Sequence, residues 1–117
     1  MKFDDIIARF DSLYINQVDH ETKAAWLNRL EAQLEDQILQ YYSIPESEMQ
    51  EYAGVFPYDE AYIHYLNMKC AERNGDTNRY NNAHAAFISA YNDLADYYNR
   101  RYESTKETRY THVLDLF

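Results

Sequence analysis

Residues 57–102 decide the fold, and they read PYDEAYIHYLNMKCAERNGDTNRYNNAHAAFISAYNDLADYYNRRY. This stretch predicts two helices joined by an Asn-Gly-Asp turn, and it holds eight of the thirteen tyrosines. Pro57 suits the first position of a helix because its missing N–H would have no partner there. Gly75 can adopt the left-handed conformation that ends a helix, and Asp76 or Thr77 is a suitable N-cap for the next one. We therefore expect a first helix of about 16 to 18 residues that begins at Pro57.

The first of these helices has an apolar arc that is wider than one core requires. At about 100° per residue the arc spans roughly 220°, whereas a helix lying on a single core needs a stripe of about 100°. Glu60, His64 and Asn67 occupy the polar remainder. Either the helix lies at the centre of its own bundle, or part of the arc contacts a neighbouring subunit. The residues of the arc are Tyr58, Ala61, Tyr62, Ile63, Tyr65, Leu66, Met68 and Cys70, and the candidate subunit contacts among them are Tyr58, Tyr65 and Met68.

The second helix has the most regular apolar pattern in the chain, over about 25 residues without Gly or Pro. His84 lies on its apolar stripe, which suggests a hydrogen-bonded core or interface residue rather than a metal ligand. Small alanines beside the stripe would let another helix approach closely, and tyrosines suit a half-wet interface. The stripe, at spacings of four and three, consists of Tyr80, His84, Phe87, Tyr91, Leu94 and Tyr98.

Two earlier segments also predict helices. Residues 3–14 have apolar positions at helical spacing, and residues 20–42 follow Asp19, which is a good N-cap. In the longer helix we expect the polar side chains Asn28, Glu31, Glu35 and Gln40 to be solvated, opposite a stripe of Leu27, Leu30, Leu34, Ile38 and Tyr41.

A loop, residues 43–56, connects these helices to the first pair. Its Pro and Gly residues and its polar composition indicate the loop, with a possible helical turn at residues 47–51. We expect Tyr52, Val55 and Phe56 to hold it against the bundle. The fold class is therefore all-α, a small helical bundle of about four helices over residues 1–103.

The C-terminal residues 104–117 form an extended tail in this interpretation. They lose the helical spacing, and the apolar sequence VLDLF follows a polar spacer. The tail either folds back on its own bundle or reaches out to add a strand or a hydrophobic plug to a partner. In the second case the candidate contacts are Tyr110, Val113, Leu114, Leu116 and Phe117.

Composition excludes several classes of function. Twenty acidic against eleven basic residues give a net charge of -9, which argues against ordinary nucleic-acid binding. An acidic surface suits a channel that passes DNA without holding it, a mimic of DNA, or simple solubility. No apolar run approaches the length of about 20 residues that a membrane span needs. A single cysteine, Cys70, fits a reducing cytoplasm.

The residue pattern gives no sign of catalysis, a cofactor or a metal. The four histidines, at positions 20, 64, 84 and 112, are isolated in sequence, and one cysteine cannot complete a zinc site with them. There is no nucleophile elbow, and two glycines are too few for a phosphate-binding loop. We therefore expect a protein that is not an enzyme and needs no cofactor.

Several of the segments quoted above also resemble a known family. PYDEAYIHYL, NGD, RYNNA and AYNDLADYYNR, with WLNRLEAQLEDQIL upstream, are similar to small head-to-tail connector proteins (adaptor or head-completion proteins) of tailed bacteriophages that infect Gram-positive hosts. The likeness covers roughly residues 24–102. The sequence differs from that family at MKCAER before the turn and at YYNRRYES after the last helix.

The resemblance implies a structural virion protein at the head-to-tail interface, present in the host cytoplasm during assembly. Such subunits form a homo-oligomeric ring, commonly of about twelve copies, under the portal protein. The ring extends the DNA channel without specific DNA binding and meets a tail-side connector or stopper protein. One alternative is a transient assembly chaperone or scaffold. Another is a small acidic inhibitor or DNA mimic that binds a host protein, using Asp4, Asp5, Asp11, Glu31, Glu35, Asp36 and Glu51.

Overall fold

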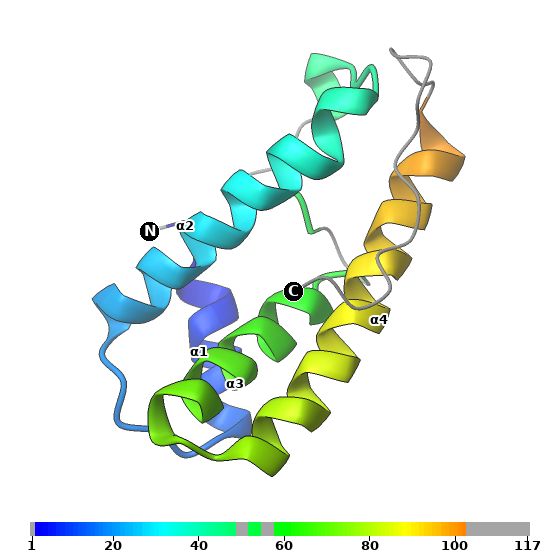
Figure 1. The fold of residues 1–117 in the computed structure, drawn as a ribbon. Coiled ribbons are helices and arrows are strands. Elements are labelled where there is room, and N and C mark those ends of the chain that lie inside the picture. Colours follow the sequence, from blue (N-terminus) through cyan, green and yellow to red (C-terminus); the bar gives the residue numbers. More distant parts are fainter. Residues whose placement is uncertain (1, 49–51, 55–57, 103–117) are drawn as a thin grey trace.

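The fold is an assembly of four α-helices, seen in a computed structural model that describes residues 2–48, 52–54 and 58–102. No strand occurs within these ranges, so the expected all-α helical bundle is confirmed. The tail, residues 104–117, lies outside the described residues. The elements are α1 (Asp4–Leu13), α2 (His20–Gln37), the 3₁₀ turns η1 (Leu39–Tyr41) and η2 (Glu46–Glu48), α3 (Glu60–Asn74) and α4 (Thr77–Arg101) (Figure 1).

The hairpin of α3 and α4 is joined as the sequence predicts. Gly75 ends α3 with a left-handed φ of 71°, and the Asp76 N–H donates to the Ala71 carbonyl at 2.9 Å. The Asp76 side chain then accepts from the Arg79 N–H at 3.1 Å, which caps α4. The predicted start of α3 was too early, because the helix begins at Glu60 and Asp59 is its N-cap.

The first helix agrees with its predicted position within one residue at each end, and α2 begins where predicted. The Asp19 carboxylate caps α2 by accepting from the Thr22 N–H at 2.7 Å. This helix ends at Gln37 rather than near residue 42, and a 3₁₀ turn replaces the last α-helical turn. Tightening into 3₁₀ geometry is common where a helix ends.

Helix α3 is the centre of the core, and it contacts α1, α2 and α4 (Figure 1). Most of the wide apolar arc is therefore buried within the chain, whereas Tyr58, which precedes the helix, is half-buried. Asn67, expected on the polar side, is in fact buried, and its Oδ1 accepts from Arg79 Nε at 2.7 Å. A buried amide is tolerated when it is hydrogen-bonded in this way. The buried residues of α3 are Ala61, Tyr62, Ile63, Tyr65, Leu66, Asn67, Met68, Cys70 and Ala71.

Three helices hold the described part of the long loop by a polar clamp. Glu31 of α2 accepts from the Ala53 N–H at 3.1 Å and from the Tyr62 hydroxyl of α3. The Tyr62 oxygen in turn accepts from the Gly54 N–H at 2.7 Å, and the Tyr98 hydroxyl of α4 donates to the Ala53 carbonyl at 2.6 Å. The expectation that Glu31 is solvated was wrong, since its carboxylate satisfies backbone and phenol donors.

Burial keeps both clamp phenols in the form that donates. Burial and the neighbouring Glu31 carboxylate raise the pKa of Tyr62 far above its ordinary value. Burial also raises the pKa of Tyr98. A side chain on Gly54 would not fit here, because a Cβ atom would lie 2.7 Å from Cε2 of Tyr62. The clamp therefore depends on a neutral Tyr62 phenol and on the absence of a side chain at Gly54.

Tyr52 also holds the loop, as predicted. Its ring centroid lies 5.6 Å from that of Phe3 and 5.4 Å from that of Tyr62. These separations are typical of favourable aromatic pairs. Val55 and Phe56, which were assigned the same role, lie outside the described residues.

We predict that Glu31→Ala destabilises the protein by about 2–3 kcal/mol, because it leaves buried donors without an acceptor. Urea unfolding followed by circular dichroism measures this loss. The matched control is Glu35→Ala, one turn further along α2 and exposed, which should change stability by no more than about 0.5 kcal/mol. Equal losses in the two variants would contradict the clamp.

Candidate assembly surfaces

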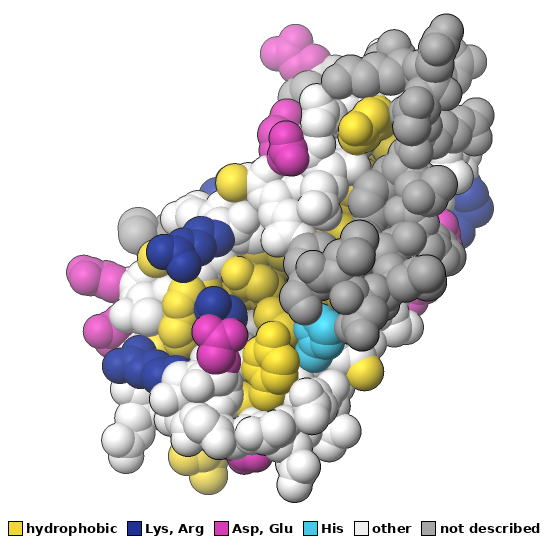
Figure 2. Space-filling model, in the orientation of Figure 1, with side chains coloured by type: hydrophobic (Ala, Val, Ile, Leu, Met, Phe, Trp, Pro, Cys, Tyr) yellow, Lys and Arg dark blue, Asp and Glu magenta, His cyan; other side chains and the backbone are white. Residues whose placement is uncertain are grey.

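The structure places the predicted subunit contacts Tyr58, Tyr65 and Met68 at different depths, with Tyr58 just before α3 and the other two on it. Tyr65 and Met68 are 8% and 6% exposed, so little of either side chain is available to a partner. Tyr58 is half-buried and reaches the surface. The other predicted contacts, Tyr110, Val113, Leu114, Leu116 and Phe117, lie outside the described residues. On the face in view in Figure 2, hydrophobic side chains gather over α3, with charged side chains toward α2.

Tyr58 belongs to an aromatic and cationic group at the C-terminal end of α4. Its ring lies 4.9 Å from that of Tyr97, and its hydroxyl accepts from Arg100 Nη2 at 3.0 Å. The Arg101 guanidinium lies 5.7 Å from the Tyr102 ring centroid. The three rings are half-buried and both arginines are exposed. We call Tyr58, Tyr97, Arg100, Arg101 and Tyr102 the tyrosine–arginine surface.

The two arginines of this surface have different kinds of partner. Arg101 forms an ion pair with Glu48 at 2.6 Å. Arg100 donates to the Tyr58 hydroxyl at 3.0 Å, so its partner in this contact is a phenol rather than a carboxylate. The sequence showed the Arg-Arg pair, but only the fold brings Tyr58 and Tyr97 beside it.

A second surface lies on the connection between α1 and α2. Ile15 is 98% exposed and Leu13 is 59% exposed, and they are the large hydrophobic side chains that stand out as exposed among the described residues. Tyr14, between them, turns inward and packs against the core. We call Leu13 and Ile15 the apolar pair. The sequence predicted a helix over residues 3–14, but the helical spacing of its apolar positions did not identify Leu13 and Ile15 as exposed.

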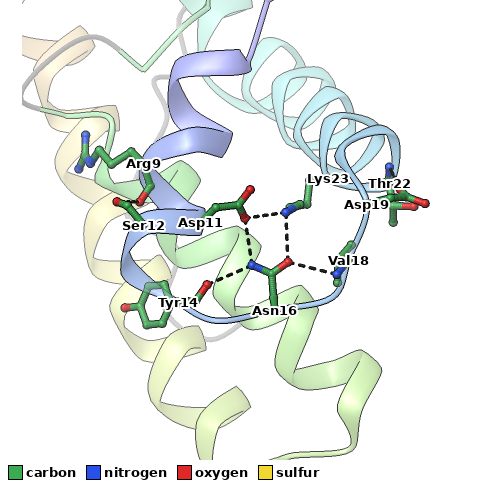
Figure 3. A network of polar contacts seen from close by, with 9 residues as sticks. All are labelled: Arg9, Asp11, Ser12, Tyr14, Asn16, Val18, Asp19, Thr22 and Lys23. Carbon is green, nitrogen blue, oxygen red and sulfur yellow. Dashed lines mark hydrogen bonds and ion pairs between the residues drawn. The ribbon is translucent and has the colours of Figure 1, made fainter.

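A polar network fixes the backbone on which the apolar pair stands (Figure 3). Asn16 is at its centre: its amide donates to Asp11 at 2.9 Å and to the Tyr14 carbonyl at 3.1 Å. Its Oδ1 accepts from the Val18 N–H at 3.2 Å and from Lys23 Nζ at 3.1 Å. With donors and acceptors both used, the connection is held in one geometry.

Lys23 links this network to α2. Its side chain is 3% exposed, and Nζ lies 2.6 Å from Asp11 Oδ1. A buried ammonium needs such partners, since burial without them carries a large desolvation penalty. Burial acts to raise the pKa of Asp11, but hydrogen bonds from Asn16 and Lys23 outweigh it and hold that pKa below its usual value.

Burial also shifts the pKa values of two other titratable residues. Burial raises the pKa of the Cys70 thiol, which disfavours the nucleophilic thiolate. Burial lowers the pKa of His64. In the ranges that the structure describes, no group of three His, Cys, Asp or Glu side chains could hold a metal ion. Within the same ranges, no helix has the length and apolar character to cross a membrane.

Comparisons with known proteins identify no relative of this chain. No protein-family model, no curated protein and no solved structure matches this chain. The functional proposal below therefore depends on the chain's own residues and on the resemblance described above.

We predict that the Asp11 network stabilises the protein above about pH 4 and loses this effect in acid. A lowered carboxyl pKa makes its contribution complete above the unfolded value of about 3.9, and it disappears as pH falls through the folded pKa. Asp11→Asn should cost about 0.5–1 kcal/mol at pH 7, a modest value because the carboxylate is partly exposed. Urea unfolding at pH 7, 5 and 3 should show this difference shrinking. Asp36→Asn, at an exposed α2 position, is the control, and a difference that did not change with pH would contradict the prediction.

Proposed function

We propose that this chain is a structural virion protein, a head-to-tail connector (adaptor) subunit of a tailed bacteriophage. The observation that carries the proposal is the resemblance of residues 24–102 to such connectors. The resembling segments lie on α2, α3, α4 and the turn between the last two. They therefore belong to one packed unit of the chain rather than to scattered loops.

The surfaces described above support an assembly role. Tyr and Arg are enriched at the centres of protein interfaces, and the tyrosine–arginine surface presents both. The net charge of -9 suits a wall past which DNA must move without being held. These features are consistent with docking and assembly, and they need no chemical turnover.

In the proposed assembly, subunits form a ring of about twelve copies beneath the portal protein. The ring would extend the DNA channel and present its other side to a tail-side connector or stopper protein. Residues 113–117 are the proposed docking plug toward one of these partners. The protein would act in the virion, after assembly in the host cytoplasm.

The alternative of an acidic inhibitor or DNA mimic has less support. A mimic needs carboxylates spaced along an open face, but Glu31 binds the backbone at Ala53 and Asp11 binds Lys23. Asp4 also lies 3.0 Å from His20 Nε2. Three of the six described carboxylates considered for that role are thus engaged within the chain, and the seventh, Glu51, lies outside the described residues.

We predict that the purified protein binds the portal protein encoded by the same phage, with a ring stoichiometry near the portal's own. Native mass spectrometry of the chain alone, the portal alone and their mixture measures this. Deletion of residues 113–117 should abolish binding while the helical circular dichroism signal is retained, whereas deletion of Met1 alone should leave binding intact. A chain that remains monomeric and ignores the portal would overturn the connector proposal in favour of the inhibitor.

A further inference from the structure

The sequence contains a single Asn-Gly pair, Asn74-Gly75, and it lies at the turn between α3 and α4 (Figure 1). Asn74 is the last residue of α3, and Gly75 follows it with a left-handed φ of 71°. Both residues are exposed. A Cβ atom placed on Gly75 would meet nothing within 4 Å, so the space around the turn is open. The pair therefore joins an asparagine side chain to the least hindered backbone neighbour that a protein offers.

The side chain of Asn74 is not held in place by the protein. In the part of the chain that the structure describes, its amide makes no hydrogen bond to another residue. The side chains of Asn16 and Asn67, by contrast, are fixed by hydrogen bonds to Asp11 and Arg79. The Asn74 amide can therefore rotate toward the backbone of its own turn.

Two backbone hydrogen bonds close this turn. The Gly75 N–H donates to the Glu72 carbonyl at 3.2 Å, and the Asp76 N–H donates to the Ala71 carbonyl at 2.9 Å. This is the usual pairing where a glycine ends a helix, and the Gly75 bond is at the long end of the normal range. Helix ends open locally at a lower free energy than helix interiors. Opening of the turn releases the Gly75 nitrogen and lets the Asn74 backbone leave its helical conformation.

We propose that Asn74-Gly75 is a site of spontaneous deamidation and isoaspartate formation in the folded chain. The backbone nitrogen of Gly75 attacks Cγ of Asn74, so that an N–Cγ bond forms and the Cγ–Nδ2 bond breaks. The side-chain nitrogen leaves as ammonia, with the proton that the Gly75 nitrogen gives up, and a cyclic succinimide remains. Water then opens this ring. Attack at Cγ gives aspartate, and attack at the backbone carbonyl carbon gives isoaspartate; neither route needs an oxidant or a reductant.

The other exposed asparagines are less suited to this reaction. Each lies within a helix and precedes a residue whose side chain crowds the approach to its nitrogen. Their reaction requires a helix to open at more than its end. These asparagines are Asn28 of α2 and Asn78, Asn81 and Asn82 of α4.

Isoaspartate at position 74 would change both the length and the charge of the turn. The main chain would pass through Cβ and Cγ of that residue, which adds one carbon atom between α3 and Gly75. The bond from the Asp76 N–H to the Ala71 carbonyl depends on the present length. The new carboxylate would also lie at the C-terminal end of α3, where the helix dipole disfavours negative charge. The modification should therefore weaken the α3–α4 hairpin.

Incubation of the folded, full-length chain at neutral pH tests the site, with peptide mapping by mass spectrometry over time. We expect aspartate and isoaspartate to form at position 74 at least about tenfold faster than at Asn28, Asn78, Asn81 or Asn82. Asn74→Gln should abolish this product, because the longer side chain closes a ring far more slowly. Asn78→Gln, exposed on the other side of the turn, is the matched control and should leave the rate at Asn74 unchanged. Equal rates at the exposed asparagines would overturn the inference.

Urea unfolding separates the effect of the longer backbone from that of the added charge. Asn74→Asp carries the same charge on a normal backbone and is the reference. The deamidated fraction, separated from the unmodified chain by its extra negative charge, should contain a component that unfolds at a lower urea concentration than Asn74→Asp. A fraction that contains isoaspartate in the peptide map and still unfolds together with Asn74→Asp would overturn the stated effect on the hairpin. Neither measurement involves a partner, so both outcomes are independent of the connector proposal.

Discussion

The burial of α3 on nearly every side is the constraint on which the rest of the structure depends. A helix with apolar residues over so wide an arc is stable in water only when several elements cover it, and α1, α2 and α4 do so. The polar atoms that this burial carries inward must also be paired. Asn67 accepts a hydrogen bond from Arg79, and Tyr62 donates one to Glu31. These two hydrogen bonds fix how α4 and α2 lie against α3.

The local features of the fold could be predicted from the sequence because their causes are local. Gly75 ends a helix through its own backbone freedom, and Asp19 and Asp76 cap helices through bonds to residues three positions away. Glu31 was misplaced because its partners lie 22 and 31 residues along the chain. Helical spacing gives the side of a helix on which a carboxylate lies, and it does not show that a distant loop returns to that side.

The same distinction applies to the candidate site. Tyr58 was identified from the sequence, but its companions Tyr97 and Arg100 lie on α4 and are brought beside it only by the packing of the fold. Ile15 has no periodic pattern to mark it, since the connection that carries it is shaped by Asn16 and its hydrogen bonds. Surfaces that form where several elements meet are set by tertiary structure, which spacing within one element cannot report.

The clamp on the loop has a consequence for how the protein loses its structure. Glu31, Tyr62 and Tyr98 come from three helices and converge on the peptide groups of Ala53 and Gly54. Separation of any one of these helices would leave the other two with unpaired buried groups, so fraying of one element raises the free energy of its neighbours. Opening events that expose this region should therefore be sub-global, and the amide hydrogens of these two loop residues should exchange with solvent as slowly as those of helix interiors.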